Sequence, residues 1–271
     1  MPARAYWIWP LAVSQNARSR IDAGLSRFDG LVHPAKWIPL SILAGVAPVA
    51  ICFAAGLRIH PALTAILLMP LFISCIRADR IFLATMIVGV VIGIHTASVI
   101  GLTLFQADSA APLLSGSDAY WQKTLHWIET GEDVTEYRPR DWLPEHVILL
   151  VGVCALSYTS WGFIPLAVGI QQLDLMNYYV GRLMLRSDHP LVMLLVGWHP
   201  WSFLRGLAYS VLIFETTSAS LERLLGRPLS TRRRRTIRWI LGLSLAFADA
   251  MVKWQFSDVI REILHDHLRA E

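Results

Sequence analysis

Residues 147–170 form a segment of 24 residues without a charged side chain, with the sequence VILLVGVCALSYTSWGFIPLAVGI. An α-helix rises about 1.5 Å per residue, so this segment is long enough to cross a hydrocarbon core roughly 30 Å thick. Several other segments have the same character, and only 16% of the residues are charged, against about 25% in soluble domains. Together with 55% hydrophobic residues, this pattern predicts an all-α, polytopic transmembrane helix bundle.

Five segments are predicted to span the bilayer fully, and a sixth apolar segment, 191–217, is interrupted by Gly197-Trp198-His199-Pro200-Trp201. Proline blocks the continuation of a helix and glycine permits unusual backbone dihedrals, so we expect a break at 197–201. The five full spans are 37–57, 61–76, 81–105, 147–170 and 239–256. The chain then divides into a cytoplasmic amphipathic N-terminal segment 1–36, three transmembrane helices in 37–105, an extracytoplasmic acidic loop 106–146, further membrane helices in 147–256 and an amphipathic C-terminal tail 257–271.

Segments outside the spans show amphipathic patterns. Ile21, Leu25 and Phe28 recur at helical spacing among arginines, which indicates an interfacial helix or a solvated tail. A helix on the membrane surface is predicted over 118–130, where tryptophan favours the headgroup zone. Residues 1–36 lack the order of a cleavable signal peptide.

The distribution of charge predicts an orientation. The first 36 residues carry five basic and two acidic side chains, residues 106–142 carry three basic and seven acidic ones, and residues 223–238 carry seven arginines. Basic segments stay in the cytoplasm, so the N-terminus is placed there, in the cytoplasmic (inner) membrane. The arginines, chiefly Arg232, Arg233, Arg234 and Arg235, are predicted to set topology and contact anionic lipid rather than nucleic acid.

If 191–217 crossed the bilayer once, the arginine cluster would lie outside the cell, against the tendency of basic segments to stay in the cytoplasm. The conflict disappears if 191–217 enters and leaves on the same side as a re-entrant pair, 191–198 and 202–217, buried in the bundle. A single span followed by an external arginine loop is the alternative.

Ionisable residues inside the apolar segments form the candidate polar site. The candidates are His199, Arg205, Glu215, Asp249 and Lys253. Charges in a bilayer usually face the bundle interior and pair with one another. Asp249 can pair with Lys253 at i, i+4 or with Arg205 from another helix. Such a site suits either structural pairing or a transport path.

Other chemistry has less support in the sequence. His265 and His267 are two residues apart and do not share a helix face, so no metal site is predicted. His60, His95 and His146 are interpreted as isolated packed or interfacial histidines, and the three cysteines as packing residues. Catalytic motifs such as GxSxG, HExxH and Walker A are absent, and no cofactor is predicted.

Residues 147–256 resemble the stage II sporulation protein M family in the order of their features. The resemblance rests on Asn177 to Gly181 in NYYVG, His199 in GWHPW and Asp249 in AFADAM. Tyr178, Trp201 and Arg205 depart from the family pattern. The resemblance implies an accessory membrane protein that assembles with partners.

The leading functional hypothesis is therefore a non-catalytic integral membrane subunit or scaffold. Its partners would be membrane lipids and other membrane proteins or a second copy, with 106–142 and 257–271 as docking surfaces. The alternatives are a small permease with a polar site near the midplane and, with less support, an intramembrane enzyme.

Overall fold

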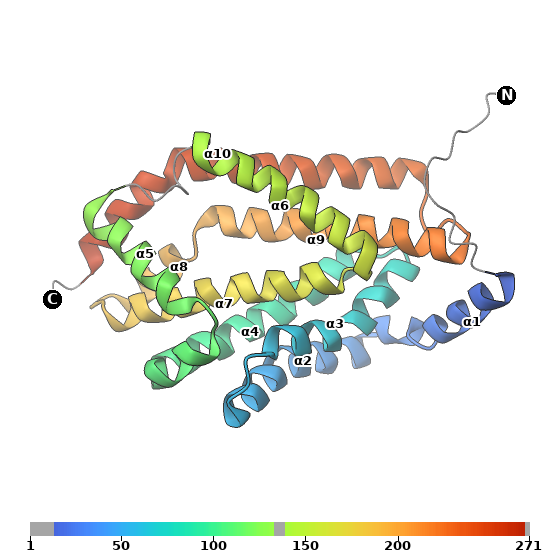
Figure 1. The fold of residues 1–271 in the computed structure, drawn as a ribbon, viewed down its shortest axis with the longest axis horizontal. Coiled ribbons are helices and arrows are strands. Elements are labelled where there is room, and N and C mark those ends of the chain that lie inside the picture. Colours follow the sequence, from blue (N-terminus) through green and yellow to red (C-terminus); the bar gives the residue numbers. More distant parts are fainter. Residues whose placement is uncertain (1–13, 133–138, 269–271) are drawn as a thin grey trace.

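The computed structural model describes residues 14–132 and 139–268, without the side chains of 139–142. Within these ranges the chain is helical, as predicted, and the long helices lie side by side (Figure 1). The elements are α1 Gln15–Ser26, η1 Asp29–Val32, α2 Pro34–Ala55, α3 His60–Arg77, α4 Ile81–Ala110, η2 Ala111–Leu113, α5 Ser117–Thr130, α6 Pro139–Ser160, α7 Phe163–Leu185, α8 Pro190–Gly197, α9 Pro200–Leu225 and α10 Arg232–His267.

Four helical segments are long and apolar enough to cross a membrane. They are Pro34–Ala55, His60–Arg77, Ile81–Leu113 and Leu143–Ser160. Large apolar side chains project from the outer surface, including Phe82, Ile148 and Phe247, which are 76%, 72% and 68% exposed. An apolar exterior of this kind suits lipid and is consistent with a membrane protein.

The prediction of one span over 147–170 is wrong, because the chain turns at Trp161 and Gly162. Both residues have positive φ, 55° and 88°, a conformation that glycine adopts without steric cost. Helix α6 ends at Ser160 and α7 begins at Phe163. The apolar segment 147–170 therefore forms parts of the two arms of a helical hairpin, and the amphipathic stretch 171–188 continues the second arm.

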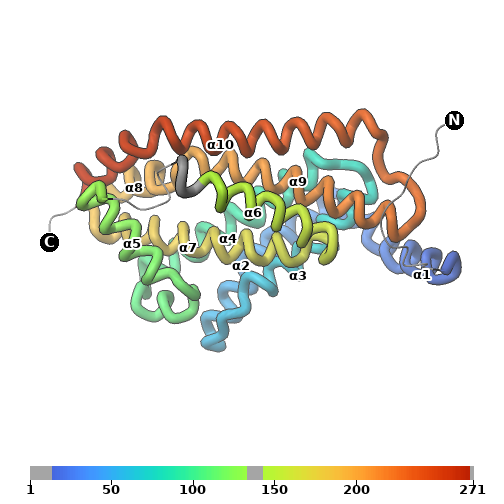
Figure 2. The backbone as a smooth tube through the Cα atoms, turned by 45° about the horizontal axis from the view of Figure 1, so that its top comes forward, coloured from blue at the N-terminus to red at the C-terminus, as the bar shows by residue number. Residues whose placement is uncertain are grey.

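Contacts between α4 and α7 establish the direction of this hairpin. His95 of α4 lies beside Asp174 of α7, and Thr103 lies against Gly181. Residue numbers rise together along this interface, so α4 and α7 are parallel. Helix α6 is consequently the return path between them, as the tube in Figure 2 shows.

The break in 191–217 occurs where it is predicted, since α8 ends at Gly197 and α9 begins at Pro200. The predicted reversal is wrong. Ser187 hydrogen-bonds to His267, Arg205 to Asp249 and Glu215 to Arg235, so α8 and α9 together run antiparallel to the whole of α10. The segment is one broken traverse rather than a re-entrant pair.

One end of the bundle, here called the arginine end, gathers α1, residues 78–80, the turn at 161–162 and the loop 226–231. Arg227 pairs with Asp22 of α1 at 3.3 Å, Arg234 with Asp79 at 2.6 Å, and Arg223 donates to Tyr158 at 3.0 Å. The arginine cluster therefore lies with the N-terminal helix, as the charge pattern requires. The extra hairpin, not a re-entrant helix, removes the conflict in the span count.

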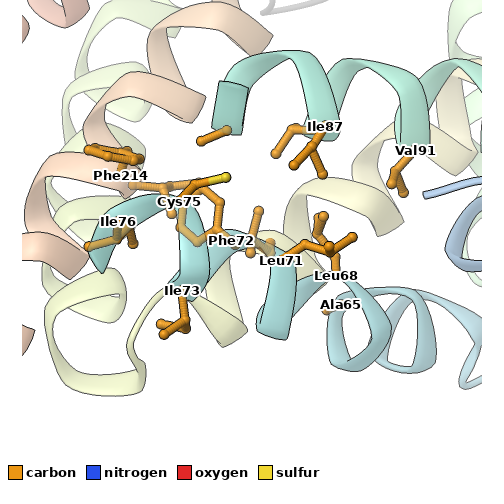
Figure 3. Packing of buried hydrophobic residues seen from close by; sticks show 14 of the residues in the cluster. Ala65, Leu68, Leu71, Phe72, Ile73, Cys75, Ile76, Ile87, Val91 and Phe214 are labelled. Atoms are coloured by element: carbon orange, nitrogen blue, oxygen red, sulfur yellow. The ribbon is translucent and has the colours of Figure 1, made fainter. Parts of the chain in front are cut away.

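The opposite end, here called the far end, carries the loop 56–59, α5 and the start of α8. The predicted helix over 118–130 is confirmed by α5, whose Trp121 and Ile128 are buried in the bundle. The predicted span 239–256 and the tail 257–271 are not separate elements, because α10 continues unbroken to His267. The apolar core nearer the arginine end joins α3, α4 and α9 through residues such as Phe72, Ile87 and Phe214 (Figure 3).

Labelling of single cysteines by a membrane-impermeant reagent is expected to place Asp188→Cys and Arg233→Cys on opposite faces of the membrane. The physical reason is that one full traverse, α8 with α9, separates these exposed positions. The unsubstituted chain gives the background, since Cys52 and Cys75 are buried. Labelling of both positions from the same face would restore the re-entrant arrangement and contradict this fold.

Candidate functional site

Three ionisable side chains from three helices meet inside the bundle. His60 Nε2 lies 2.8 Å from Asp174 Oδ2, and His95 Nε2 lies 2.7 Å from Asp174 Oδ1. The two imidazole rings stack with their centroids 5.8 Å apart. One carboxylate thus bridges two histidines, and we call these residues the histidine–aspartate cluster.

Helix ends and helix pairing bring the cluster together. Helix α2 ends at Gly56, which has a left-handed φ of 67°, and the short loop that follows places His60 immediately before Pro61 at the start of α3. His95 and Asp174 lie midway along the parallel helices α4 and α7. Because α3 begins at the level of these two residues, its first side chain can reach them.

Burial makes the cluster energetically costly. His60, His95 and Asp174 are 4%, 1% and 2% exposed, and ionisable groups removed from water require partners. Asp174 accepts a bond on each oxygen, whereas His95 Nδ1 is buried without a hydrogen-bond partner. A buried imidazole nitrogen left in this state is unusual in a purely structural site.

A cavity of about 230 Å³ leads to the cluster from the far end. Exposed Arg58, Ser115 and Gln171 line its outer part, and buried His60 and Asp174 line its inner part. The cluster is therefore adjacent to space that a small solute can enter.

The donor set fits a divalent first-row transition metal. One ligand atom from each residue can be chosen so that all lie within 4.8 Å of one another. Tetrahedral zinc with bonds of about 2.0–2.2 Å holds its ligand atoms about 3.3–3.5 Å apart. The Nε2 atoms of His60 and His95 lie 2.8 and 2.7 Å from the carboxylate oxygens, so these two distances must lengthen to admit an ion. Two histidines with one carboxylate leave a further coordination position open. The same groups can also hold and exchange a proton.

The sequence interpretation of His60 and His95 as isolated histidines is wrong. Both contact one carboxylate that comes from a residue 79 or more positions away. Asp174 was visible in the sequence only as a polar residue on an amphipathic stretch. The sequence offered one signal for this site. His95 lies in an apolar segment, His60 lies just before one and Asp174 just after one, so the three residues could have been considered together as possible partners. His146, the third of these histidines, is half-buried near the start of α6.

Of the residues predicted as one polar site, Glu215 lies apart, whereas His199, Arg205, Asp249 and Lys253 stay in one neighbourhood, where the charges of Arg205 and Lys253 act on His199. Arg205 binds Asp249 through two hydrogen bonds of 3.0 and 3.2 Å, so the interhelical alternative is confirmed for Asp249. Lys253 is buried one turn further along α10. Glu215 lies near the arginine end and belongs to another network.

His199 lies among aromatic rings at the α8–α9 break. Its ring stacks on Trp201 at 4.5 Å between centroids and also contacts Tyr179 and Trp127. His199 is 3% exposed and its Nε2 has no hydrogen-bond partner. No cluster of three metal-ligating groups other than His60, His95 and Asp174 occurs in the part of the chain that the structure describes. His265 and Asp266 at the end of α10 are exposed.

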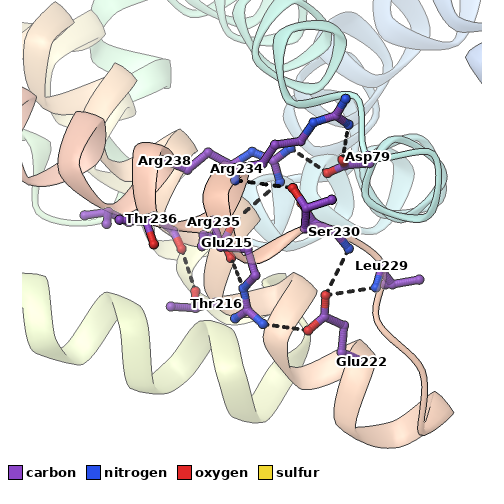
Figure 4. A network of polar contacts seen from close by, with 12 residues as sticks. Asp79, Glu215, Thr216, Glu222, Leu229, Ser230, Arg234, Arg235, Thr236 and Arg238 are labelled. Atoms are coloured by element: carbon purple, nitrogen blue, oxygen red, sulfur yellow. Dashed lines mark hydrogen bonds and ion pairs between the residues drawn. The ribbon is translucent and has the colours of Figure 1, made fainter.

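An ionic network joins α9, α10 and the loop after α3 near the arginine end (Figure 4). Glu215 is fully buried and accepts from Arg235 at 2.6 Å and from Arg238 at 3.5 Å. Arg235 also binds Glu222. Arg238 reaches Asp79 on its other side.

The charges of this network are mutually compensated. Burial alone would raise the pKa of Asp79, but hydrogen bonds from Arg238 and Arg234 outweigh it and hold that pKa below its ordinary value. Arg234 and Arg235, predicted to contact lipid, instead bind carboxylates of the chain. Arg232 and Arg233 are exposed and make no ion pair with a described residue, so they remain available to lipid.

In comparisons with known proteins, no family model, no curated protein and no solved structure matches the chain. The resemblance to the stage II sporulation protein M family stays a prediction.

Proposed function

We propose that this protein is a small membrane carrier for a divalent first-row transition-metal cation, with His60, His95 and Asp174 as its binding site. The observation that carries the proposal is the convergence of two buried imidazoles and one buried carboxylate at the inner part of a cavity. Ionisable groups inside membrane helices commonly mark an ion path. This conclusion keeps the permease hypothesis but moves its site from Arg205 and Asp249 to Asp174.

The charge of the cluster suits a cation that enters and leaves. With neutral histidines the cluster carries a single negative charge, so a divalent ion is attracted without being surrounded by fixed charge. Ligation would move each ring proton from Nε2 to Nδ1, and affinity would fall as the histidines become protonated. The carrier would thus release its ion more readily at acidic pH.

The orientation in the membrane is part of the proposal. The arginine end would face the cytoplasm of a cell with an inner membrane, and the far end, with its cavity and acidic loop, would face outward. Helix α7, the broken pair α8 and α9, and α10 would cross the bilayer beside the four apolar helices.

A scaffold function has its own support in the Arg205–Asp249 pair. This bidentate contact joins α9 to α10, and Asp249 is only 3% exposed. Neither residue lines the cavity that leads to the histidine–aspartate cluster. Such a pair suits helix packing, and the expected family resemblance also favours assembly with partners. Co-purification of another membrane protein in stoichiometric amount would support this second function.

Zinc uptake into proteoliposomes that contain a trapped zinc-sensitive dye tests the carrier. We expect uptake above that of protein-free vesicles, and at least a tenfold loss of initial rate for Asp174→Asn and for His95→Gln. Both variants remove a ligand without changing side-chain size greatly. Each variant must show the unfolding temperature of a folded protein before its rate is compared.

A matched control is His199→Gln, which removes a buried histidine outside the cluster. Its uptake should stay within about twofold of the unsubstituted protein, because no ligand to the ion is lost. Equal uptake by the unsubstituted protein and by Asp174→Asn would overturn the proposal. If a trapped pH-sensitive dye reported proton movement that did not depend on zinc, the cluster would be a proton relay instead.

A further inference from the structure

A second cavity, of about 530 Å³, lies at the arginine end between α1 and the end of α9. Its lining combines arginines with hydrogen-bonding side chains and one leucine. The lining residues are Gln15, Arg18, Ser19, Asp22, Leu225 and Arg227. We call it the α1 cavity.

The electrostatics of the α1 cavity favour an anion. Asp22, its one acid, is bound by Arg77 and by Arg227. The hydrogen bond from Arg77 holds the pKa of Asp22 below its ordinary value, so its negative charge is compensated twice. Arg18 has no carboxylate partner among the described residues, and its Nε is buried without a hydrogen-bond partner.

The guanidinium of Arg18 lies against the backbone at the end of α9. It lies across Gly226, where an added Cβ would approach its Nη1 closely. A guanidinium presents several N–H donors in one plane, which suits the oxygens of a phosphate group. Gln15 adds an amide donor one turn before Ser19 on the same helix, whereas the Ser19 hydroxyl already donates to the Asn16 carbonyl.

The position of the cavity identifies the source of that phosphate. The exposed apolar surface begins at Phe82 of α4 and Ile237 of α10, close to Arg80 and Arg234 in the sequence. The arginine end therefore borders the surface that suits lipid, and Leu225 lines the α1 cavity at this end. Basic groups at this level attract anionic lipid.

We propose that the α1 cavity binds the phosphate headgroup of an anionic phospholipid, with Arg18 as the residue that contacts the phosphate. Lipid bound there would fix α1 against the end of α9. The proposal concerns the arginine end alone, so it stands or falls separately from the metal site at the far end.

Thermal unfolding of the full-length protein in neutral detergent micelles tests this site. The probe is short-chain phosphatidylglycerol, compared with phosphatidylcholine of the same chain length and with inorganic phosphate. We expect phosphatidylglycerol to raise the unfolding temperature by several degrees, and Arg18→Gln to remove at least half of that rise. Arg18→Lys should lose an intermediate part, since lysine keeps the charge but not the planar fork.

The matched control is Arg20→Gln, which removes the same charge from an exposed position of α1 outside the cavity lining. It should keep nearly all of the lipid effect. An equal loss for Arg18→Gln and Arg20→Gln would show diffuse attraction and overturn the site. An equal stabilisation by inorganic phosphate, or by phosphatidylcholine, would overturn the assignment to an anionic lipid. For each variant, the unfolding temperature without lipid is subtracted from the unfolding temperature with lipid. A variant that is less stable without lipid can therefore still be compared.

Discussion

Replacement of Glu215 by alanine is expected to lower the free energy of unfolding by about 3–5 kcal/mol, the cost of leaving a buried charge without its partner. Glu215 is 0% exposed and accepts from both Arg235 and Arg238. Arg238 is itself 6% exposed, so it cannot turn to water when the carboxylate is removed. Chemical unfolding in detergent, followed by tryptophan fluorescence, measures the loss.

Asp29→Ala is the matched control, because it also removes a carboxylate bound to an arginine. The Asp29 side chain is 49% exposed, and its buried partner Arg77 keeps its bond to Asp22 when Asp29 is removed, so the loss of Asp29 should cost only about 1 kcal/mol. A similar cost for both variants would contradict the view that burial decides the contribution of Glu215.

A double variant separates the lost pair from the lost packing. Glu215→Leu leaves the buried Arg238 with Asp79 as its remaining carboxylate partner, whereas Glu215→Leu combined with Arg238→Met removes that charge as well. The double variant should be more stable than Glu215→Leu alone, as replacements of whole buried pairs often are. Equal stability of the two proteins would indicate that Asp79 alone satisfies Arg238.

Replacement of Gly162 by alanine is expected to lower the free energy of unfolding by about 2–4 kcal/mol, because the alanine would be strained in the left-handed conformation and would overlap its neighbours. The φ of Gly162 is 88°, and an added Cβ would lie 2.8 Å from Thr217 Oγ1 and 3.2 Å from Ile213 Cγ2 of α9. The turn between α6 and α7 cannot move away, because it is packed against α9. Thermal unfolding in detergent gives the change.

Gly169→Ala serves as the control for this substitution on the same hairpin. Gly169 is helical and exposed, and nothing lies within 4 Å of an added Cβ. Its replacement should change stability by no more than about 1 kcal/mol, since alanine is the better helix former. If Gly162→Ala were as harmless as this control, the tight turn at 161–162 would be wrong.

The membrane class and many helix positions were predictable from the sequence, because they depend on local properties. Apolar length identified the helices over 37–57, 61–76 and 81–105, and the period of Trp121, Leu125 and Ile128 identified α5. The break at 197–201 was predictable too, since proline and glycine act on the backbone within one turn.

The hairpin at Trp161 and Gly162 was not predictable from apolar length, because either one long helix or two shorter ones would shield the same side chains from water. Whether the chain turns there depends on whether Gly162, in its left-handed conformation, can pack against another helix. In the folded protein that helix is α9. The direction of each later helix follows from this turn, which is why the predicted re-entrant pair was unnecessary.

The sequence by itself determined that this chain belongs in a membrane and that its arginines lie with its N-terminal helix, because hydropathy and charge act residue by residue. Only the tertiary structure decided which buried charges meet. His60, His95 and Asp174 come from three helices far apart in the chain, and Glu215 and Asp249 go to different partners. Pairing of this kind depends on how the helices are shifted along one another, and the sequence of one helix alone does not specify that shift.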